Sequence, residues 1–441
     1  MRAACSKLES EGEELASICR RIDVDLSTSS SRARAAAEAV HSAAYLSRLE
    51  KLCEESEKLK KPLKVADEDD ETEFTYLTST SLDDALGCCE AALALWRQVD
   101  SGSSGSSATT TAAAAAAAAA APGPRAALAL VRPPGHHAGR GVEGAEPDSP
   151  EGAPSGFCLV NTAAALARSI ASSSTSTPTS SSISNGRRVL VIDWDVHVGD
   201  GTQDIFWGHP RRRRRREAKE KENGNGNDDD DDEGSGGVEE NDEEEESEDE
   251  QVCVVDLHEA GAWPGGGGIE VQGEGGGGGG GGGSACGRGK LKTRDGKNDL
   301  SRIVNVPLPS GSGDALARAA FERVISPIAD RFGPQAIVVS AGFDAHELEP
   351  LAGLNWKDET FQFLGASTAA LAAKHGCGVL FVLEGGYSRR ALRSAVAALA
   401  KGAATLEVPE LVVEEGGEEE GRVLAREEEE AIRAVVEEHK L

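Results

Sequence analysis

The feature that most constrains the fold of this chain is a set of short apolar segments that each lead directly into polar residues. The clearest spans residues 189–207, VLVIDWDVHVGDGTQDIFW, where aliphatic residues are followed by acids and a histidine. The same change occurs in VRPPGHH, VVDLH, VSAGFD and LEGGY. Apolar strands of this kind, separated by helix-like stretches, predict a single α/β domain with a central, mostly parallel sheet flanked by helices.

The expected elements follow from the same patterns. Apolar spacing predicts helices over residues 33–58 and 80–99. We expect strands over residues 188–193, 252–258, 302–309, 336–344 and 378–387, and one that starts near Ala126. In open α/β sheets the ligand lies beyond the carboxyl ends of the strands, so the polar segments are expected to form one site.

The net charge of the 441-residue chain is −30, but sixteen of the acids lie in residues 228–250. They follow six arginines at 211–216, so a solvated insertion is favoured over a nuclear import signal or a nucleic-acid patch. We expect a domain over 33–405 with low-complexity insertions at about 100–124, 171–186, 210–250 and 265–298, and an acidic tail over 406–441, either helical or disordered. No direct nucleic-acid partner is expected.

The nine cysteines are scattered and form no CxxC motif, which favours a reducing compartment over a disulfide framework or a zinc finger. No apolar run reaches membrane-spanning length, so no membrane association is expected. The first residues contain no long apolar stretch of the kind found in secretory signals.

Asp195, His197 and Asp344 are candidate metal ligands. Asp195 and His197 lie two residues apart at the end of a strand and therefore face the same side, and Asp344 follows another strand. Two carboxylates and one imidazole suit a catalytic zinc ion with one position left open. The alternative is an acidic strand end that caps a helix or makes only hydrogen bonds.

His136 and His137 are candidates for acid–base chemistry because they follow the rigid pair Pro133–Pro134. Each would need a carboxylate partner, and Asp193 and Asp200 are available. The alternative is a histidine pair on a surface loop.

Tyr387 follows two glycines, Gly385 and Gly386, which allow a tight turn that points the phenol into a cleft. There it could donate a hydrogen bond to an oxyanion. Phe157 and Trp263 stand beside glycine or proline and suit the walls of a narrow tunnel. For all three aromatic residues, ordinary packing in a loop or in the core is the alternative.

Taken together, these residues resemble the zinc-dependent histone deacetylase family, which has the arginase/deacetylase fold. The resembling blocks are RPPGHHAG, PSGFCLVNTAAALA, VLVIDWDVHVGDGTQDIFW, NVPLPSGSGD, VVSAGFDAHELEPLAGL and VLEGGYS, in the family's order over about residues 126–390. The sequences of these blocks are most similar to those of class II enzymes and of bacterial deacetylase-like amidohydrolases.

The resemblance implies a role for each candidate. Asp195, His197 and Asp344 would hold zinc, His136 would pair with Asp193, and His137 with Asp200. His137 would act as general base and then general acid, and Tyr387 would polarise the acetyl carbonyl. The implied substrate-binding residues are Gly156, Phe157, Trp263, Leu351 and Gly386. The resemblance also implies a structural potassium ion near Asp193, Asp195, His197 and residues 256–257.

Three residues depart from the family pattern. Val198 replaces a second histidine, with little catalytic loss expected. Asp200 stands where class II enzymes usually have Asn and would make His137 more basic. Asp256 stands where Ser is usual, beside the expected potassium site. The family's N-terminal strand with its HP…R-type motif has no recognisable counterpart in this sequence, so we expect the central sheet to lack that strand.

The resemblance implies a deacetylase that acts on acetyl-lysine in histones or other proteins, with a role in chromatin regulation and transcription repression. An acetylated protein or peptide would be the partner, with a corepressor complex as a further one, in the nucleus, the cytoplasm or an organelle. One alternative is an amidohydrolase of small acetylated amines or polyamines; Leu351, where polyamine-selective relatives carry an acid, favours acyl-lysine. A second alternative to a deacetylase of proteins is a catalytically weak corepressor or scaffold module.

Overall fold

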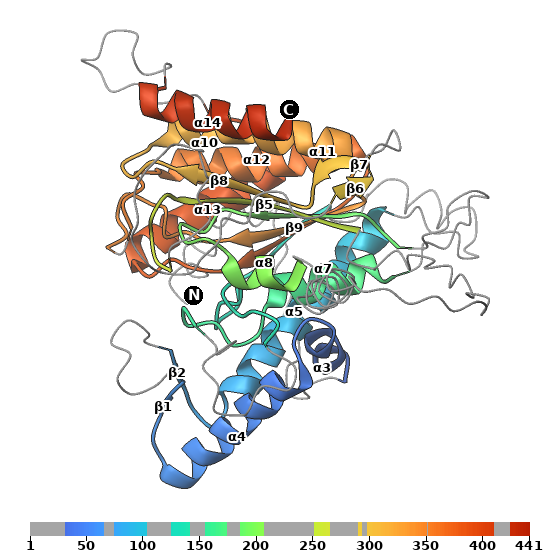
Figure 1. The fold of residues 1–441 in the computed structure, drawn as a ribbon, viewed down its shortest axis with the longest axis vertical. Coiled ribbons are helices and arrows are strands. Elements are labelled where there is room, and N and C mark those ends of the chain that lie inside the picture. Colours follow the sequence, from blue (N-terminus) through green and yellow to red (C-terminus); the bar gives the residue numbers. More distant parts are fainter. Residues whose placement is uncertain are drawn as a thin grey trace, which may run out of the picture.

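A six-stranded parallel sheet forms the centre of the molecule (Figure 1). The computed structural model describes residues 31–65, 75–103, 125–141, 155–173, 186–206, 251–264, 290–292, 298–350, 352–409 and 424–441. The strands lie in the order β3 (Ala126–Ala129), β10 (Val379–Leu383), β9 (Ala336–Ala341), β4 (Val189–Asp193), β5 (Val252–Glu259) and β8 (Ile303–Leu308). All their pairings are parallel, which confirms the predicted sheet.

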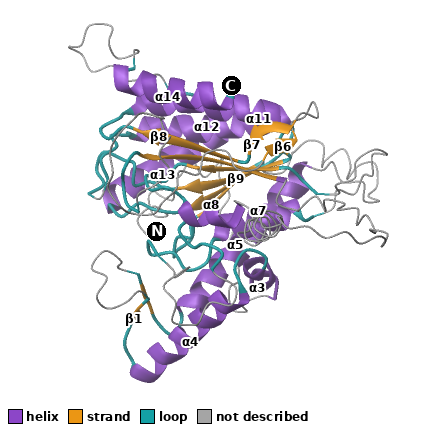
Figure 2. Ribbon diagram, viewed as in Figure 1, coloured by secondary structure: helices purple, strands orange, loops and turns teal. Residues whose placement is uncertain are grey.

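Helices cover both faces of the sheet (Figure 2). Leu190 and Ile192 pack with one helical layer, and the alternate residues Val189 and Val191 pack with the other. The first layer contains α10 (Asp314–Ala320), η2 (Phe321–Ile325), α11 (Ser326–Phe332), α12 (Asp358–His375), α13 (Arg389–Thr405) and α14 (Arg426–His439). The second contains α3 (Ser31–Glu38), α4 (Ala43–Leu59), α5 (Ser81–Ser103), α7 (Thr162–Ala171) and α8 (Asp200–Phe206). Burial of the strands on both faces explains why they are apolar throughout.

The structure changes the predicted elements in two places. The single helix predicted over 33–58 is wrong: it is divided into α3 and α4, and Ser42 caps α4 by accepting a hydrogen bond from the Tyr45 amide at 3.2 Å. A side-chain cap of this kind starts a new helix where the apolar spacing alone suggests continuity. Within the expected insertion at 265–298, β6 (Lys290–Lys292) pairs with β7 (Asn298–Ser301).

The other expected insertions lie almost entirely outside the described residues. A second two-stranded pairing joins β1 (Leu63–Lys64) and β2 (Tyr76–Leu77). In the C-terminal segment, α14 packs on the first helical layer with Ile432 and Val435 fully buried. Among the described residues, no helix is both long enough and apolar enough to cross a lipid bilayer.

The strand order explains how distant segments meet. Strands β3, β10, β9 and β4 are consecutive in the sheet although they are far apart in the sequence. Because the strands are parallel, the loops that follow them leave at the same edge. These loops carry His136, Tyr387, Asp344 and Asp195, respectively.

His41 connects the N-terminal helices to two of the loops at this edge. Its Nδ1 lies 2.7 Å from the Gly139 carbonyl, and its Nε2 lies 3.0 Å from the Asn161 amide. A carbonyl only accepts and an amide N–H only donates, so these contacts require the neutral tautomer with the proton on Nδ1. Burial lowers the pKa of His41 from 6.5 to about 4.

We therefore expect His41 to make stability fall between pH 6.5 and pH 4. Over this range the unfolded chain binds a proton that the folded chain excludes, so the free energy of unfolding decreases as pH falls, by roughly 3 kcal/mol in total. Urea denaturation across this range, compared with a His41→Asn variant, measures the effect. An equal pH slope in both proteins would contradict it.

Candidate active site

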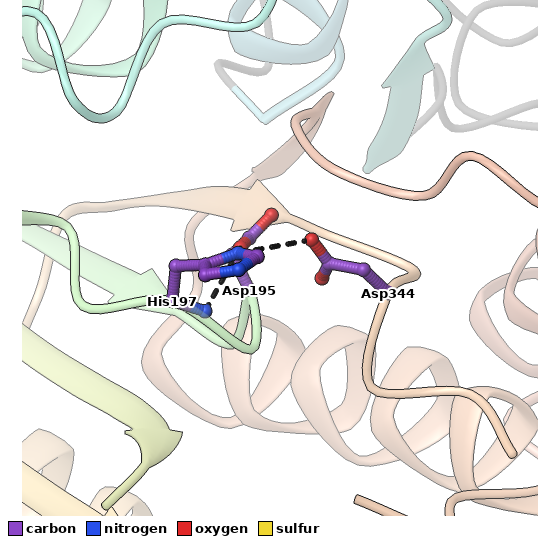
Figure 3. Close-up of side chains that lie close together, drawn as sticks. All are labelled: Asp195, His197 and Asp344. Atoms are coloured by element: carbon purple, nitrogen blue, oxygen red, sulfur yellow. Dashed lines mark hydrogen bonds and ion pairs between the residues drawn. The ribbon is translucent and has the colours of Figure 1, made fainter. Parts of the chain in front are cut away.

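The side chains of Asp195, His197 and Asp344 point toward one another at the edge of the sheet (Figure 3). One ligand atom from each lies within 4.8 Å of the others. His197 Nδ1 is 3.1 Å from Asp195 Oδ1 and 3.3 Å from Asp344 Oδ2. The structure thus brings together the three residues that the sequence predicted as metal ligands.

Backbone amides fix both carboxylates. The Gly385 amide donates to Asp195 Oδ2 at 2.7 Å, and the Val196 amide donates to Asp344 Oδ1 at 3.1 Å. A Cβ atom on Gly342 or Gly385 would collide with these carboxylates, so the glycines allow the backbone to approach them closely. Asp195 and Asp344 are therefore held in place by groups that do not neutralise their charge.

This arrangement fits a divalent cation. Within the described part of the chain, the only partner of Asp344 Oδ2 is His197 Nδ1 at 3.3 Å, although Asp344 is almost fully buried. Burial lowers the pKa of His197, but its hydrogen bonds with Asp195 and Asp344 raise it to about 10. The two carboxylates thus favour a positive charge at His197. A zinc ion supplies that charge and accepts nitrogen and oxygen ligands.

Both histidines of the predicted pair are buried and each contacts its predicted carboxylate. His136 Nδ1 is 3.1 Å from Asp193 Oδ2, and His137 Nδ1 is 2.7 Å from Asp200 Oδ1. The two rings are adjacent, with centroids 4.0 Å apart. In each ring the carboxylate contacts Nδ1, so Nε2 is the nitrogen that remains for acid–base chemistry.

The two histidines differ in their electrostatic environment. Burial lowers the pKa of His136, but the charges of Asp195 and Asp193 raise it well above its ordinary value. Burial lowers the pKa of His137, and the charge of His136 lowers it further against the opposing effect of Asp200. The pair therefore favours a charged His136 beside a neutral His137.

Tyr387 and two other aromatic residues surround the approach to this cluster. The ring centroids of Phe157 and Tyr387 are 5.6 Å apart, and those of Trp263 and His137 are 4.9 Å apart. Phe157, Trp263 and Tyr387 are 40%, 38% and 40% exposed, which places them at the surface and not in the core. Burial of the phenol raises the pKa of Tyr387, so this group stays protonated and able to donate.

The two predicted substrate-binding glycines lie next to these aromatic residues and to the histidine pair. Gly156 has φ +55°, and a Cβ there would collide with the ring of His137. Gly386 has φ +107° and directly precedes Tyr387. Both conformations favour glycine. Leu351 lies outside the described residues.

The predicted potassium ion gains no support from Asp256. Its Oδ2 accepts hydrogen bonds from the Gly199 amide at 2.9 Å and from Gln203 Nε2 at 2.8 Å. Its Oδ1 lies 2.8 Å from His258 Nδ1. Both oxygens thus have protein partners, and the ion stays a prediction.

Sequence reasoning missed three residues that support the site. The buried carboxylate of Glu349 accepts hydrogen bonds from the Tyr387 amide at 2.9 and 3.0 Å and from the Ser388 amide at 2.8 Å. Arg132 donates to the Gly386 carbonyl at 2.6 Å and lies over the Tyr387 ring. Glu384 accepts from the Gly135 and His136 amides at 2.6 and 3.2 Å.

One signal could have found these residues. Glu349, Arg132 and Glu384 are charged residues within the conspicuous segments HELEP, VRPPG and LEGGY. A charge next to an apolar strand needs a partner, whether or not it takes part in chemistry.

We expect the purified protein to bind one zinc ion per chain. His197→Ala and Asp344→Asn should each weaken zinc binding more than 100-fold, which exceeds the usual effect of losing a group that only orients a ligand. Metal analysis and competition with a chelator measure this. His375→Gln, which changes a histidine that pairs with Asp330, serves as the control. Unchanged zinc affinity in both ligand variants would contradict the site.

Comparison with known proteins agrees with this geometry. The family model described as "Histone deacetylase domain" matches residues 5–403. "Histone deacetylase 10, chloroplastic" from Oryza sativa subsp. japonica is 31% identical over 326 residues, which cover 73% of this chain and 51% of that protein. "Histone deacetylase 14, chloroplastic" from Arabidopsis thaliana is 31% identical over 326 residues, which cover 73% and 53%. The chain spans about half the length of these curated relatives.

A solved structure has the same fold. The crystal structure of the HDA15 HD domain aligns with a TM-score of 0.61 and 21% identity, over 99% of this chain and 85% of that one. The single-domain arginase/deacetylase fold is therefore confirmed. With a family model that matches most of its length, the chain belongs to the histone deacetylase family of hydrolases.

Proposed function

We propose that this protein is a zinc-dependent deacetylase that hydrolyses N-ε-acetyl-lysine in histones or other proteins and releases acetate. One observation carries the proposal: the Asp195–His197–Asp344 group lies beside two buried histidine–carboxylate pairs and a tyrosine. This set contains a metal site, a proton acceptor and an oxyanion donor, which are the parts that amide hydrolysis requires.

The metal and the His137–Asp200 pair would share the activation of water. Zinc, when bound, supplies Lewis-acid polarisation of the amide carbonyl and of the attacking water. Asp200 holds Nδ1 of His137, so Nε2 is free to take a proton from water and later deliver one to the lysine nitrogen. His136, held by Asp193, would stabilise negative charge that develops nearby.

Tyr387 would donate its phenolic proton in a hydrogen bond to the oxyanion. Its backbone is fixed by Glu349, and its ring lies under the guanidinium of Arg132. We therefore assign Glu349 and Arg132 as positioning residues, which act through Tyr387 and do not contact the reacting atoms. Phe157 and Trp263 would flank the aliphatic part of the lysine side chain.

The compartment stays a prediction. Two relatives have "chloroplastic" in their names. An organelle therefore stays among the expected locations, together with the nucleus and the cytoplasm. A role in chromatin and a corepressor partner are likewise proposals that depend on the location.

Replacement of the phenol should separate chemistry from metal binding. Tyr387→Phe is expected to lower kcat on an acetyl-lysine peptide by about 10² to 10³-fold, the usual effect of removing one oxyanion donor. Zinc content should stay unchanged, because Tyr387 is not among the metal ligands. Peptide turnover with purified protein and measured zinc content checks both expectations.

The same assay tests the alternative functions. Faster turnover of acetylated polyamines than of any acetylated peptide would contradict the assignment of acetyl-lysine. A zinc-loaded protein with no turnover of any acetylated substrate would favour a binding module.

Glu349→Ala should lower kcat about 10-fold or more, because the amides of Tyr387 and Ser388 lose their acceptor. Glu349→Gln retains one carbonyl acceptor and should recover most of the activity. In a Tyr387→Phe background the same Glu349→Ala change should have little further effect, because two residues that act as a unit are not additive. Additive losses in this cycle would show that Glu349 acts by another route.

A further inference from the structure

A cavity of about 680 Å³ opens beside the loop that carries Tyr387. Its lining is almost entirely polar and charged: His346, Glu347, Leu348, Lys357, Asp358, Glu359, Arg389, Arg390, Arg393 and Ser394. Nothing in the proposed chemistry of the active site uses these residues.

Three arginines on α13 dominate one wall of this cavity. Arg389, Arg390 and Arg393 are exposed, and their guanidinium groups pair with no carboxylate in the described ranges. Elsewhere in the fold exposed arginines do find partners, as Arg426 does with Glu430 at 2.8 Å. The first turn of α13 contains no acid, so these positive charges are left uncompensated at that position.

The acids of the cavity are placed differently. Asp358 Oδ1 lies 3.3 Å from His346 Nε2. Asp358 and Glu359 both belong to the first turn of α12, where the partial positive charge of the helix end compensates them. The remaining acid, Glu347, is exposed. Within the described residues, none of these acids forms an ion pair with the three arginines, so the arginine wall remains available to a carboxylate from outside.

The cavity is joined through the sequence to the loop that carries Tyr387. Leu348 and Arg389 line it, and each is adjacent in sequence to a residue of the Glu349–Ser388 hydrogen bond that fixes the tyrosine loop. A peptide whose acetyl-lysine enters beside Tyr387 must lay its neighbouring residues across the surface around that loop. Because an extended chain advances about 3.3–3.6 Å per residue, residues a few positions from the acetyl-lysine would extend over the start of α13.

We propose that the arginine wall binds an acidic side chain of the substrate, close in sequence to the acetyl-lysine. The inference rests on the proposed function and specifies its substrate class: acetyl-lysine with a nearby Asp or Glu. Guanidinium groups recognise carboxylates through paired, charge-assisted hydrogen bonds, which makes arginine better suited than lysine to this task. The strong negative charge of the whole chain is screened beyond about 8 Å at physiological ionic strength, so local contacts decide the preference.

The test uses acetyl-lysine peptides in which one residue, either Asp, Asn or Lys, is moved through the positions on both sides of the acetyl-lysine. With the zinc-loaded full chain, the best Asp peptide should exceed its Asn counterpart about 10-fold in kcat/KM, with most of the difference in KM. The combined change Arg389→Ala, Arg390→Ala and Arg393→Ala should remove this preference and leave turnover of the Asn peptides unchanged. Arg390→Glu should reverse the preference, so that the Lys peptides become better substrates than the Asp peptides.

Arg433→Glu on α14 is the matched control, since it changes the same charge on an exposed residue outside the cavity, and it should retain the preference. Equal kcat/KM for Asp and Asn peptides at every position would overturn the proposal, as would a preference that survives the triple change. If no acetylated peptide is hydrolysed, the proposed function fails, and the binding of the same labelled peptides, measured by fluorescence anisotropy, still decides whether the arginines select an acid.

Discussion

The structure depends on how the chain holds buried negative charge at the carboxyl edge of its sheet. Asp195 and Asp344 are almost fully buried, come from two strands that are neighbours, and share one histidine. Backbone amides of Val196 and Gly385 orient the carboxylates without neutralising them. Because isolated buried carboxylates are strongly unfavourable, this edge must provide positive charge, either as a proton on His197 or as a metal ion.

The same constraint organises the next layer of residues. Two histidines of the loop after β3 form histidine–carboxylate pairs: His136 with Asp193, the last residue of β4, and His137 with Asp200, the first residue of α8. Their positions follow from the strand order, which makes β3, β10, β9 and β4 consecutive. The glycines of this edge have no side chains, which lets the backbone approach the carboxylates and ring atoms closely.

Charge outside the metal group has two distinct uses. The carboxylates of Glu349 and Glu384 are buried and bind backbone amides, so they set the conformation of the loops that carry Tyr387 and His136. The arginines at the start of α13 are exposed and unpaired within the described residues, so they are available to a ligand. Charged residues that are buried and hydrogen-bonded thus shape the site, whereas exposed charged residues without an ion pair can bind a ligand.

The sequence by itself determined the parallel sheet, because strands buried on both faces must be apolar throughout. It also determined which residues meet at the edge, since polar residues after parallel strands share one side of the sheet. Only the tertiary structure decided the partners of Glu349 and Arg132 and the contact of Asp256 with Gln203, because these partners are distant in sequence and no local pattern encodes them. The division of the first helix at Ser42 and the cavity beside α13 have the same origin: both depend on side-chain contacts that periodicity does not contain.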